Sequence, residues 1–351
     1  MTPKDLGFYF PAEWEKHKAT WLNYPHNENS WPGKIDTIYP SYHIFIKFLA
    51  DVEVVHINVI SEAMKQSVYY SLLMIGTNMS NVHFHIIPTN DAWTRDCGPA
   101  FLLNRNDDKQ KAIVNWTYNA WGGKYPCDLD NEIPLKVAEL LNLKVFEPGI
   151  VMEGGSVDFN GVGDVLTTKA CLLNPNRNPS LTQGQIEEKL CNFYGVDNVI
   201  WLGDGIEGDD TDGHVDDLSR FVNEDTIVTV VETNEEDENY LPLKENLALL
   251  NKVRLSSGKQ PNVVELPMPD PVIWEDQRLP ASYANFYIAN NTVIMPVFKC
   301  EKDNKAYYIL EECFKDKTIQ AVDSTDIIWG LGSFHCLSQQ EPELKSEKDV
   351  E

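Results

Sequence analysis

The stretch "DDTDGHVDDLSRFVNEDTIVTVVE" (209–232) joins a polar segment to a predicted β-hairpin. Its second half alternates apolar and polar residues, turns at "NED", and continues as a β-branched strand. The same form returns about every 60 residues, and this spacing favours radial repetition of a β-rich unit. An irregular mixed α/β domain is the alternative. The other hairpins are "PAFLLNRNDDKQKAIVNW" (99–116), "SVDFNGVGDVLTTKA" (156–170) and "NFYIANNTVIMPVF" (285–298).

Helical patterns lie between these hairpins and in the first third of the chain. The clearest is "SLTQGQIEEKLCNFYG" (180–195), where Ser180 or Thr182 serves as the N-cap and Gly195 ends the helix. A mixed α/β fold with helices outside the repeated strands is therefore expected. The further predicted helices are 36–52, 61–76, 131–143 and 305–317, and the further predicted strands are 52–60 and 81–88.

Composition is that of a globular protein. The chain has 351 residues, of which 42% are hydrophobic and 24% charged. The N-terminus has no apolar signal segment, and no stretch approaches the roughly 20 apolar residues that span a bilayer. Seven cysteines without a CxxC pair indicate reduced thiols rather than disulfides or a zinc site. We predict a cytoplasmic protein with one catalytic domain over 1–340 and a frayed acidic tail over 341–351.

The charge of the chain bounds its partners. The net charge is −25, from 54 acidic and 29 basic residues. A surface this negative repels phosphate backbones and anionic lipid, so nucleic acid and membranes are not expected as partners. It attracts a small cationic molecule, although an acidic surface also serves solubility alone.

Chemically versatile side chains stand just before each predicted hairpin and near the end of the chain. In a radially repeated fold these strand starts meet at the axis, where carboxylates, a histidine and a thiol would share one cavity. The "HVD" segment is predicted to place two of them on the same face of a strand. The side chains are Asp96, Glu153, His214, Asp216, Asn285 and Cys336.

Each of these pieces also has a plainer interpretation. An H-x-D pair is usually a solvated surface pair, and "EGGS" (153–156) reads equally well as a turn. Arg95 and Asp96 fit a simple ion pair. Cys336 fits an inert core thiol, although the small residues of "GLGS" (330–333) leave room around its sulfur. No single piece decides the function.

The ordered set of segments closely resembles the agmatine deiminase and bacterial peptidyl-arginine deiminase family. The resemblance extends from "ATWLNYPHNENSWPG" (19–33) through "NAWGGKY" (119–125) to the C-terminal "CLSQQ". It implies a five-bladed α/β propeller, or pentein, built of ββαβ-type units around a central active site. The segments that carry it are "WTRDCGP", "EGGS", "GHVDD", "SYANFYIAN" and "GLGSFHCLSQQ", in that order.

The resemblance implies a role for each residue in hydrolysis of a guanidinium to a ureido group and ammonia. Cys336 matches the family nucleophile, and a strong nucleophile is needed because the guanidinium carbon is a poor electrophile. His214 would act first as acid and then as base, held and charged by Glu153. Asp96 and Asp216 match the aspartates that hold the planar cation through paired hydrogen bonds.

The substrate tail is argued from residues near this set. Trp93, Trp121 and Asp210 favour a ligand that ends in an ammonium group, and Asn285 is assigned to substrate binding with them. Agmatine, converted to N-carbamoylputrescine in polyamine synthesis, is therefore the leading substrate. His335 is predicted to be structural, because on a strand it would point away from the side that presents Cys336.

Several alternatives stay open. The "GDDTDGH" and "GLGSFHC" segments depart in detail from the agmatine pattern, so arginine or peptidyl-arginine deimination and amidino transfer remain possible activities. A non-catalytic guanidinium-binding protein is the alternative from another class. The resemblance implies no metal and no cofactor, and the oligomeric state stays open, with a homo-oligomer among the alternatives.

Overall fold

A computed structural model describes residues 1–107 and 109–344 of the chain. Within this part, four sheets repeat one strand pattern, in which the first strand is antiparallel to the second and the second is parallel to the third. The antiparallel pairs confirm the four predicted hairpins. The first sheet contains β5 (Ala100–Asn104), β6 (Lys111–Val114) and β7 (Lys144–Phe146), with β1 (Phe8–Tyr9) added at the edge. The second contains β8 (Val157–Phe159), β9 (Asp164–Thr168) and β10 (Asn198–Leu202), and the third contains β11 (Ser219–Asn223), β12 (Thr226–Val231) and β13 (Asn262–Pro267). The fourth contains β16 (Tyr287–Ala289), β17 (Thr292–Val297) and β18 (Thr318–Asp323).

Helices connect the second and third strands, because parallel neighbours need a crossover connection. These are α5 (Ile133–Leu141), α7 (Gln183–Tyr194), α8 (Tyr240–Leu250) and α9 (Lys302–Cys313), with the short α6 (Lys169–Leu172) preceding α7. The prediction for α7 is confirmed in detail: Thr182 caps it through a capping box, and Gly195 ends it with φ 70°. The sequence analysis did not predict α8, which buries Leu243 and Leu250 from its short amphipathic pattern.

The fifth sheet joins the two ends of the chain. β2 (His17–Asn23) pairs antiparallel with β19 (Ser338–Pro342) and parallel with β3 (Val54–Val59), which pairs with β4 (Val82–Ile86). α1 (Ile35–Val52) and α2 (Glu62–Met74) supply the crossovers. Because β2 and β19 come from opposite ends of the sequence, this sheet fixes the C-terminal segment against the N-terminal one.

The predicted boundary of the tail at 340 needs correction. β19 continues through Glu341 and Pro342. The Glu341 side chain is buried, accepting a hydrogen bond from Trp21 Nε1 at 2.9 Å and pairing with Lys111 Nζ at 2.7 Å. The last part of the predicted tail, 345–351, lies outside the described residues, whereas Glu343 and Leu344 are described.

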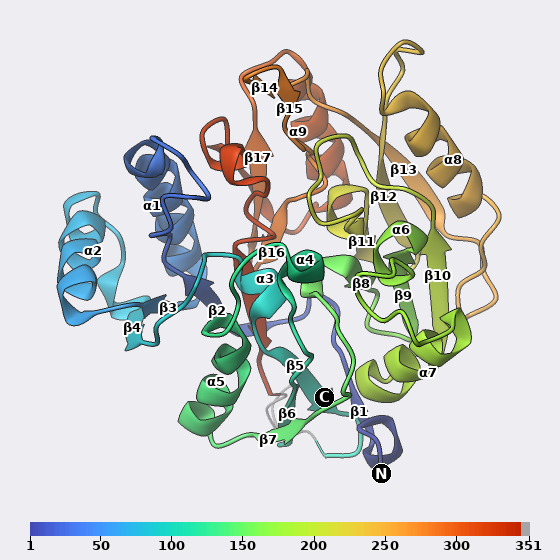
Figure 1. Cartoon of the computed structure of the whole chain (residues 1–351), viewed down its shortest axis with the longest axis horizontal. Helices are drawn as coiled ribbons and strands as arrows, with labels where there is room; N and C mark the ends of the chain where they lie inside the picture. Colours follow the sequence, from blue (N-terminus) through green and yellow to red (C-terminus); the bar gives the residue numbers. More distant parts are fainter. Residues whose placement is uncertain (108, 345–351) are drawn as a thin grey trace.

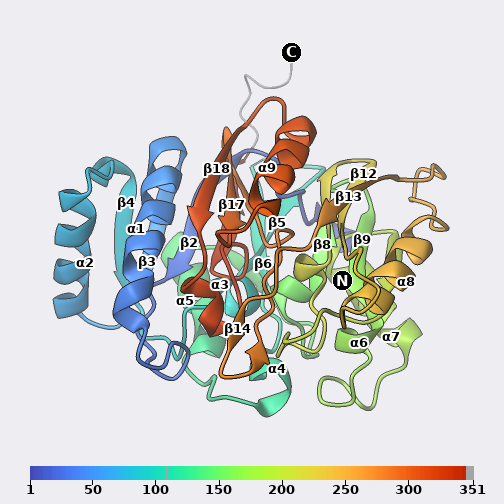
Figure 2. The ribbon, with the colours of Figure 1, turned by 90° about the horizontal axis from the view of Figure 1, so that it is seen from above.

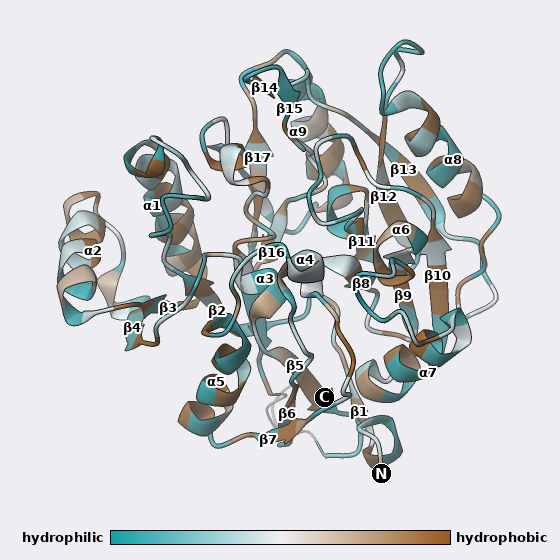
Figure 3. Ribbon diagram, in the orientation of Figure 1, coloured by the Kyte–Doolittle hydropathy of each residue, from teal (hydrophilic) through white to brown (hydrophobic). Residues whose placement is uncertain are grey.

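The arrangement places the short polar segments near the middle of the molecule. Figure 1 shows α3 (Thr94–Cys97), α4 (Ala120–Gly123) and the adjoining ends of β8 and β11 near the centre, with α2, α5, α7 and α8 at the periphery. Seen from above in Figure 2, α2 and α8 lie at opposite ends of the molecule, and α1 packs against both β3 and β18, which belong to different sheets. Hydrophobic residues concentrate on the strands and the inner faces of the helices (Figure 3), as expected when helices cover sheets. Within the described ranges, no helix is long and apolar enough to cross a membrane.

Candidate active site

The predicted site residues lie in short turns that immediately precede the hairpins. Asp96 is in α3, Glu153 precedes the 3₁₀ helix η4 (Gly154–Ser156), and Asp216 is in the 3₁₀ helix η5 (Val215–Asp217). His214 caps η5, so the prediction that "HVD" lies on a strand was wrong. A 3₁₀ turn replaces the alternation of a strand, yet it still brings His214 and Asp216 to the same centre, as their contacts below show.

Asp96 is fixed by two donors from distant segments. Trp121 Nε1 donates to Asp96 Oδ2 at 2.9 Å, and the Gly155 backbone N–H donates to Oδ1 at 2.9 Å. Burial raises the pKa of Asp96; the His214 charge opposes this effect and the Asp216 carboxylate adds to it. The two hydrogen bonds therefore fix the orientation of the Asp96 carboxylate, and a cation that enters beside it would favour the ionised form.

His214 is fully buried, and its ring is surrounded by carboxylates. Nδ1 lies 3.7 Å from Asp96 Oδ1, and neither ring nitrogen has a hydrogen-bond partner among the residues described. Burial by itself lowers the pKa of His214, but the carboxylates of Asp96, Asp216 and Glu153 outweigh it, so the pKa lies above its ordinary value. An imidazolium with both N–H groups available is suited to donate a proton.

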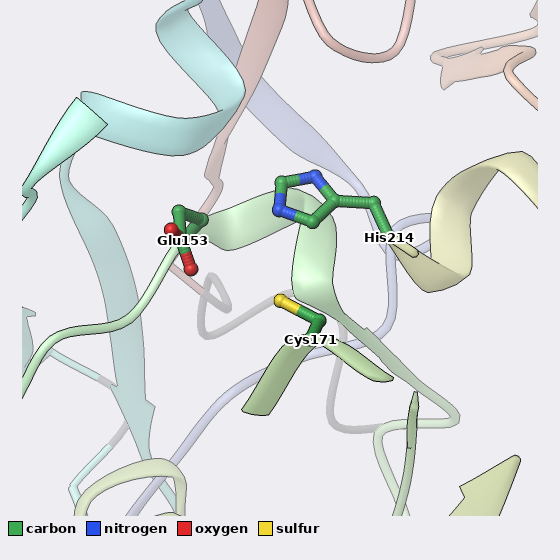
Figure 4. Close-up of side chains that lie close together, drawn as sticks. All are labelled: Glu153, Cys171 and His214. Carbon is green, nitrogen blue, oxygen red and sulfur yellow. The ribbon is translucent and has the colours of Figure 1, made fainter. Parts of the chain in front are cut away.

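Glu153 is paired on one side and open on the other. Its Oε1 accepts from Arg177 Nε at 2.5 Å, while Oε2 is buried and has no partner within the described ranges. Figure 4 shows Glu153, His214 and Cys171 gathered together, and their ligand-type atoms lie within 4.8 Å of one another. The structure thus brings Glu153 close to His214, without a direct hydrogen bond between them in the part of the chain it describes.

Cys336 lies beside two polar side chains. Asn285 Nδ2 donates to its sulfur at 3.0 Å, and the thiol donates to Asp216 Oδ2 at 3.6 Å. Burial raises the pKa of Cys336 well above its ordinary value, and the carboxylates of Asp216 and Asp217 add to this. The thiol is therefore protonated until a positive charge arrives next to it.

The orientation predicted for His335 was wrong. His335 and Cys336 lie in a turn before β19 rather than on a strand, so both side chains reach the same carboxylate. His335 Nδ1 is 2.6 Å from Asp216 Oδ2, and its Nε2 is 2.8 Å from Glu13 Oε2. The sequence reasoning failed because strict alternation holds only within a strand.

A cavity of about 280 Å³ leads to this centre. Trp93 and Trp121 line it, and Asp96 and Cys336 lie on its wall. Asp210 also lines the cavity, as the sequence suggested, but its carboxylate already accepts from Tyr125 OH at 2.9 Å and lies 3.3 Å from Lys124 Nζ. The remaining lining residues include Asn27, Asn29, Ser30, Pro32, Asp91, Thr211, Trp274, Gln277, Trp329 and Leu331.

The sequence analysis missed several residues of this site. Arg177, which pairs with Glu153, comes from the turn-rich "NPNRNP" (174–179), where an arginine among turn residues was the one available signal. Glu13 precedes β2 and carried no motif. Trp274 belongs to the two-stranded ribbon of β14 (Ile273–Trp274) and β15 (Gln277–Arg278), and its ring packs 4.8 Å from that of Trp329.

Among the residues that the structure describes, two groups of side chains have spacings that a metal ion could use. Besides the group in Figure 4, the ligand-type atoms of Asp216, Asp217 and Cys336 lie within 4.8 Å of one another. In the first group Arg177 already supplies a positive charge to Glu153, which weakens the attraction for a cation. Of the second group, Cys336 lines the cavity described above, whereas Asp216 and Asp217 are not among the lining residues.

Replacing Gly155 with Ala should lower turnover about 100-fold or more, because displacements near 1 Å at an active site have effects of this size. A Cβ at position 155 would lie 2.6 Å from His214 Nδ1, 2.8 Å from Asp96 Oδ1 and 3.0 Å from Asp216 Oδ2. Steady-state kinetics of the folded variant would measure the loss.

Gly184→Ala is the matched control, because no atom lies within 4 Å of the position of its Cβ. This control should keep full activity and gain slight helix stability. A fully active Gly155→Ala variant would contradict the packing of the site described above.

Known proteins resemble this chain in both sequence and structure. The model of the Porphyromonas-type peptidyl-arginine deiminase family matches residues 9–342. A protein of Legionella pneumophila (strain Paris) named "Putative agmatine deiminase" is 37% identical over 346 residues, covering 97% of each chain. A structure of the agmatine deiminase of Enterococcus faecalis is 31% identical, covers 98% of both chains and superposes with a TM-score of 0.91. That of C. jejuni agmatine deiminase with substrate bound is 33% identical, covers 96% of both chains and has a TM-score of 0.87.

The match to the family model and the relatives over nearly the whole chain agree with the site geometry. The resemblance drawn from the sequence motifs is thereby confirmed. The chain belongs to the Porphyromonas-type peptidyl-arginine deiminase family and is a hydrolase that acts on C–N bonds.

Proposed function

We propose that this protein is an agmatine deiminase that hydrolyses agmatine to N-carbamoylputrescine and ammonia. One observation carries the proposal: a thiol, a buried histidine and two carboxylates converge where an aromatic-lined cavity ends. Relatives named as agmatine deiminases support the choice of substrate. A cytoplasmic location and a place in polyamine synthesis belong to the same proposal.

We also infer a five-bladed α/β propeller of the pentein type for the whole domain. Four sheets with one strand pattern, and a fifth that joins both chain ends, support this arrangement. Each unit would place the turn before its first strand at the axis. This explains why site residues recur before the hairpins.

Substrate binding would place the guanidinium between Asp96 and Asp216. Asp216 Oδ1 is buried and has no hydrogen-bond partner in the described part of the chain, which is costly for a carboxylate oxygen unless a donor arrives. The forked N–H groups of a guanidinium supply such donors in the required plane. The cation also neutralises the carboxylates that hold the Cys336 thiol protonated.

The chemical steps then follow from the groups in place. The Cys336 thiol loses its proton to bulk water as the substrate cation binds. The thiolate then forms a C–S bond to the guanidinium carbon, one C–N π pair moves onto nitrogen, and a tetrahedral intermediate results. His214 donates a proton to the departing nitrogen, and the C–N bond breaks. Ammonia departs, and the rest of the substrate stays bound to Cys336 as a covalent thiouronium. His214 next takes a proton from water as the water oxygen attacks the same carbon. Collapse breaks the C–S bond, releasing the ureido product and Cys336.

Glu153 and Asn285 support these steps. Glu153 favours the charged form of His214 through its negative charge. Burial raises the pKa of Glu153, and the Arg177 ion pair opposes this rise and orients the carboxylate. Asn285 donates to the Cys336 sulfur and thereby orients it, and a donor at this position also favours the thiolate. Asn285 would act on the nucleophile rather than on the substrate tail.

The tail of the substrate would lie along Trp93 and Trp121 toward Asp210. Aromatic faces and an acidic group attract an ammonium ion, whereas an α-carboxylate would need a free cationic partner. Lys124 is the nearby cation, and it already contacts Asp210 and Asp212. This pairing favours an amine-ended substrate over arginine.

The test is release of ammonia and ureido product from agmatine, arginine and a blocked arginyl peptide. We expect turnover of agmatine, with little or no turnover of arginine or the peptide.

Asp210→Asn should raise the KM for agmatine about 3- to 10-fold with kcat nearly unchanged, as for a partly exposed charge contact. It should leave n-butylguanidine, which lacks the ammonium, unaffected.

Two results would refute the assignment. Preferential turnover of arginine or its peptide would keep the deiminase chemistry and overturn the assignment of the tail. A lack of product from all three, with transfer of the amidino group to an added amine, would instead establish an amidinotransferase.

A further inference from the structure

His335 is a buried side chain that takes no part in the chemical steps above. We propose that His335 is the positioning residue of Asp216, holding one carboxylate oxygen so that the other is presented to the substrate guanidinium. This inference rests on the proposed function, because it assigns Asp216 to the substrate. It also brings Glu13, from the N-terminal segment, into the support of the site.

The two contacts of the ring define both its orientation and its charge. Nδ1 lies 2.6 Å from Asp216 Oδ2, and Nε2 lies 2.8 Å from Glu13 Oε2. A histidine that donates through both nitrogens is an imidazolium, since a neutral ring carries one N–H. A neutral ring would place one unprotonated nitrogen within hydrogen-bond distance of a carboxylate oxygen, where the two lone pairs repel unless that carboxylate is protonated. The ring is therefore held at both ends, with its positive charge between two negative groups.

Asp216 uses its two oxygens for different purposes. Oδ2 accepts from His335 and also lies 3.6 Å from Cys336 Sγ, whereas Oδ1 is the buried oxygen left for the substrate. Burial acts to raise the pKa of Asp216, but the hydrogen bond and charge of His335 outweigh it, and the pKa lies below its ordinary value. His335 thus keeps the carboxylate both ionised and aimed.

Glu13 anchors the far end of this arrangement. Its Oε2 lies 3.0 Å from Arg220 Nη2 and 3.4 Å from Arg95 Nη2. Charges therefore alternate in sign from the two arginines through Glu13, His335 and Asp216 to the cationic substrate. Removing His335 takes away the cationic side chain that hydrogen-bonds the buried Asp216, whereas Glu13 keeps its two arginines.

Two amide variants separate the two ends of the ring. The side-chain N–H of Asn falls near Nδ1 of histidine, so His335→Asn keeps a donor for Asp216. That of Gln falls near Nε2, so His335→Gln keeps a donor for Glu13 and leaves Asp216 Oδ2 with the Cys336 thiol alone as a donor among the described residues. We expect His335→Gln to lower kcat/KM for agmatine about 10- to 100-fold, the range for hydrogen bonds to charged groups. His335→Asn should recover most of this loss.

The pH profile provides a readout that loss of packing alone would not move. Asp216 must be ionised to hold the guanidinium, so kcat/KM falls as pH drops through its pKa. His335→Gln removes both the hydrogen bond and the charge that lower this pKa, so the acid limb should move to higher pH. His335→Asn loses the charge but keeps the hydrogen bond, so its acid limb should move less. Besides His335, the titratable and charged groups that face Asp216 are Asp96, His214, Asp217, Arg220 and Cys336, and both variants retain all of them.

His17→Gln is the structural control. His17 is also buried and also contacts a carboxylate, Glu53 Oε1 at 3.3 Å. Its Nε2 lies 2.7 Å from the backbone carbonyl oxygen of Glu13, and within the described ranges it makes no hydrogen bond with Asp216. Its melting temperature should fall as much as that of His335→Gln, without the shift of the acid limb. Equal kinetic losses in His17→Gln and His335→Gln would overturn the positioning role.

A second measurement does not depend on turnover of agmatine. 2-Chloroacetamidine carries a guanidinium-like cation and alkylates a thiolate, so that the C–S bond forms and chloride leaves. Iodoacetamide alkylates a thiolate with loss of iodide and carries no cation. The preference of Cys336 for the cationic reagent should fall about 10-fold or more in His335→Gln and persist in His335→Asn. An unchanged preference in His335→Gln would refute the proposal. Absence of agmatine turnover with this pattern intact would refute the proposed substrate alone.

Discussion

Cys336→Ser should lower agmatine turnover about 10⁵-fold or more, the scale seen when an enzyme loses its nucleophile. A serine hydroxyl ionises far less readily than a thiol, and the carboxylates that already oppose ionisation of Cys336 would oppose it more strongly. The substrate should still bind, because Asp96 and Asp216 are untouched. Single-turnover kinetics and calorimetric titration with agmatine would measure the two effects separately.

Cys171→Ser is the matched control for this prediction. Cys171 is also buried and lies in the group with Glu153 and His214 shown in Figure 4, but it does not line the cavity that reaches Cys336. Its thiol is kept neutral by burial, which raises its pKa well above the ordinary value. The control should retain activity within about threefold. Mass spectrometry of acid-quenched wild type should find the amidino adduct on Cys336; an adduct on Cys171 would contradict the assignment.

The second large effect is expected for His214→Asn. This variant should lose about 10³- to 10⁴-fold in kcat, because the leaving nitrogen and the attacking water lose the same proton carrier. In the wild type the carboxylates of Asp96, Asp216 and Glu153 raise the pKa of His214. The charged form therefore persists above the ordinary histidine pKa of about 6.5, and the alkaline limb of kcat should lie above that value.

The His214 prediction has its own control and its own contrary result. His56 is half-buried and contacts His85 Nε2 at 2.8 Å, away from the cavity, so His56→Gln should change kcat little. Loss of agmatine turnover in His214→Asn should come without loss of agmatine binding, since both aspartates remain. Weakened binding with unchanged kcat would instead assign His214 to substrate recognition.

Local patterns predicted most of the elements correctly. The four hairpins, the N-cap at Thr182 and the stop at Gly195 depend on neighbours within a few residues, and all of them are present. The same local reasoning overlooked α8. It also ended the domain at 340, because the partners of Glu341 are remote in sequence.

The structure brings the predicted site residues together, although their geometry was predicted less well, and their catalytic roles stay a prediction. The converging set of Asp96, Glu153, His214 and Asp216 around Cys336 agrees with the motif order. The sequence analysis missed the residues that support this set. Arg177 lies 24 residues from Glu153, and His335 reaches Glu13 across 322 residues, so no motif could join them.

The sequence by itself determined the repeated strand–turn–strand units, the helix caps and the family, because these depend on alternation, turn residues and ordered motifs. Only the tertiary structure decided how the side chains face one another: that β19 closes a sheet with β2, that His335 turns toward Asp216, and that Asp216 keeps one oxygen free. The physical reason is the distance along the sequence over which each interaction acts. Backbone preference acts over a few residues, whereas the burial and pairing of charges at this site depend on groups that only the folded chain brings together.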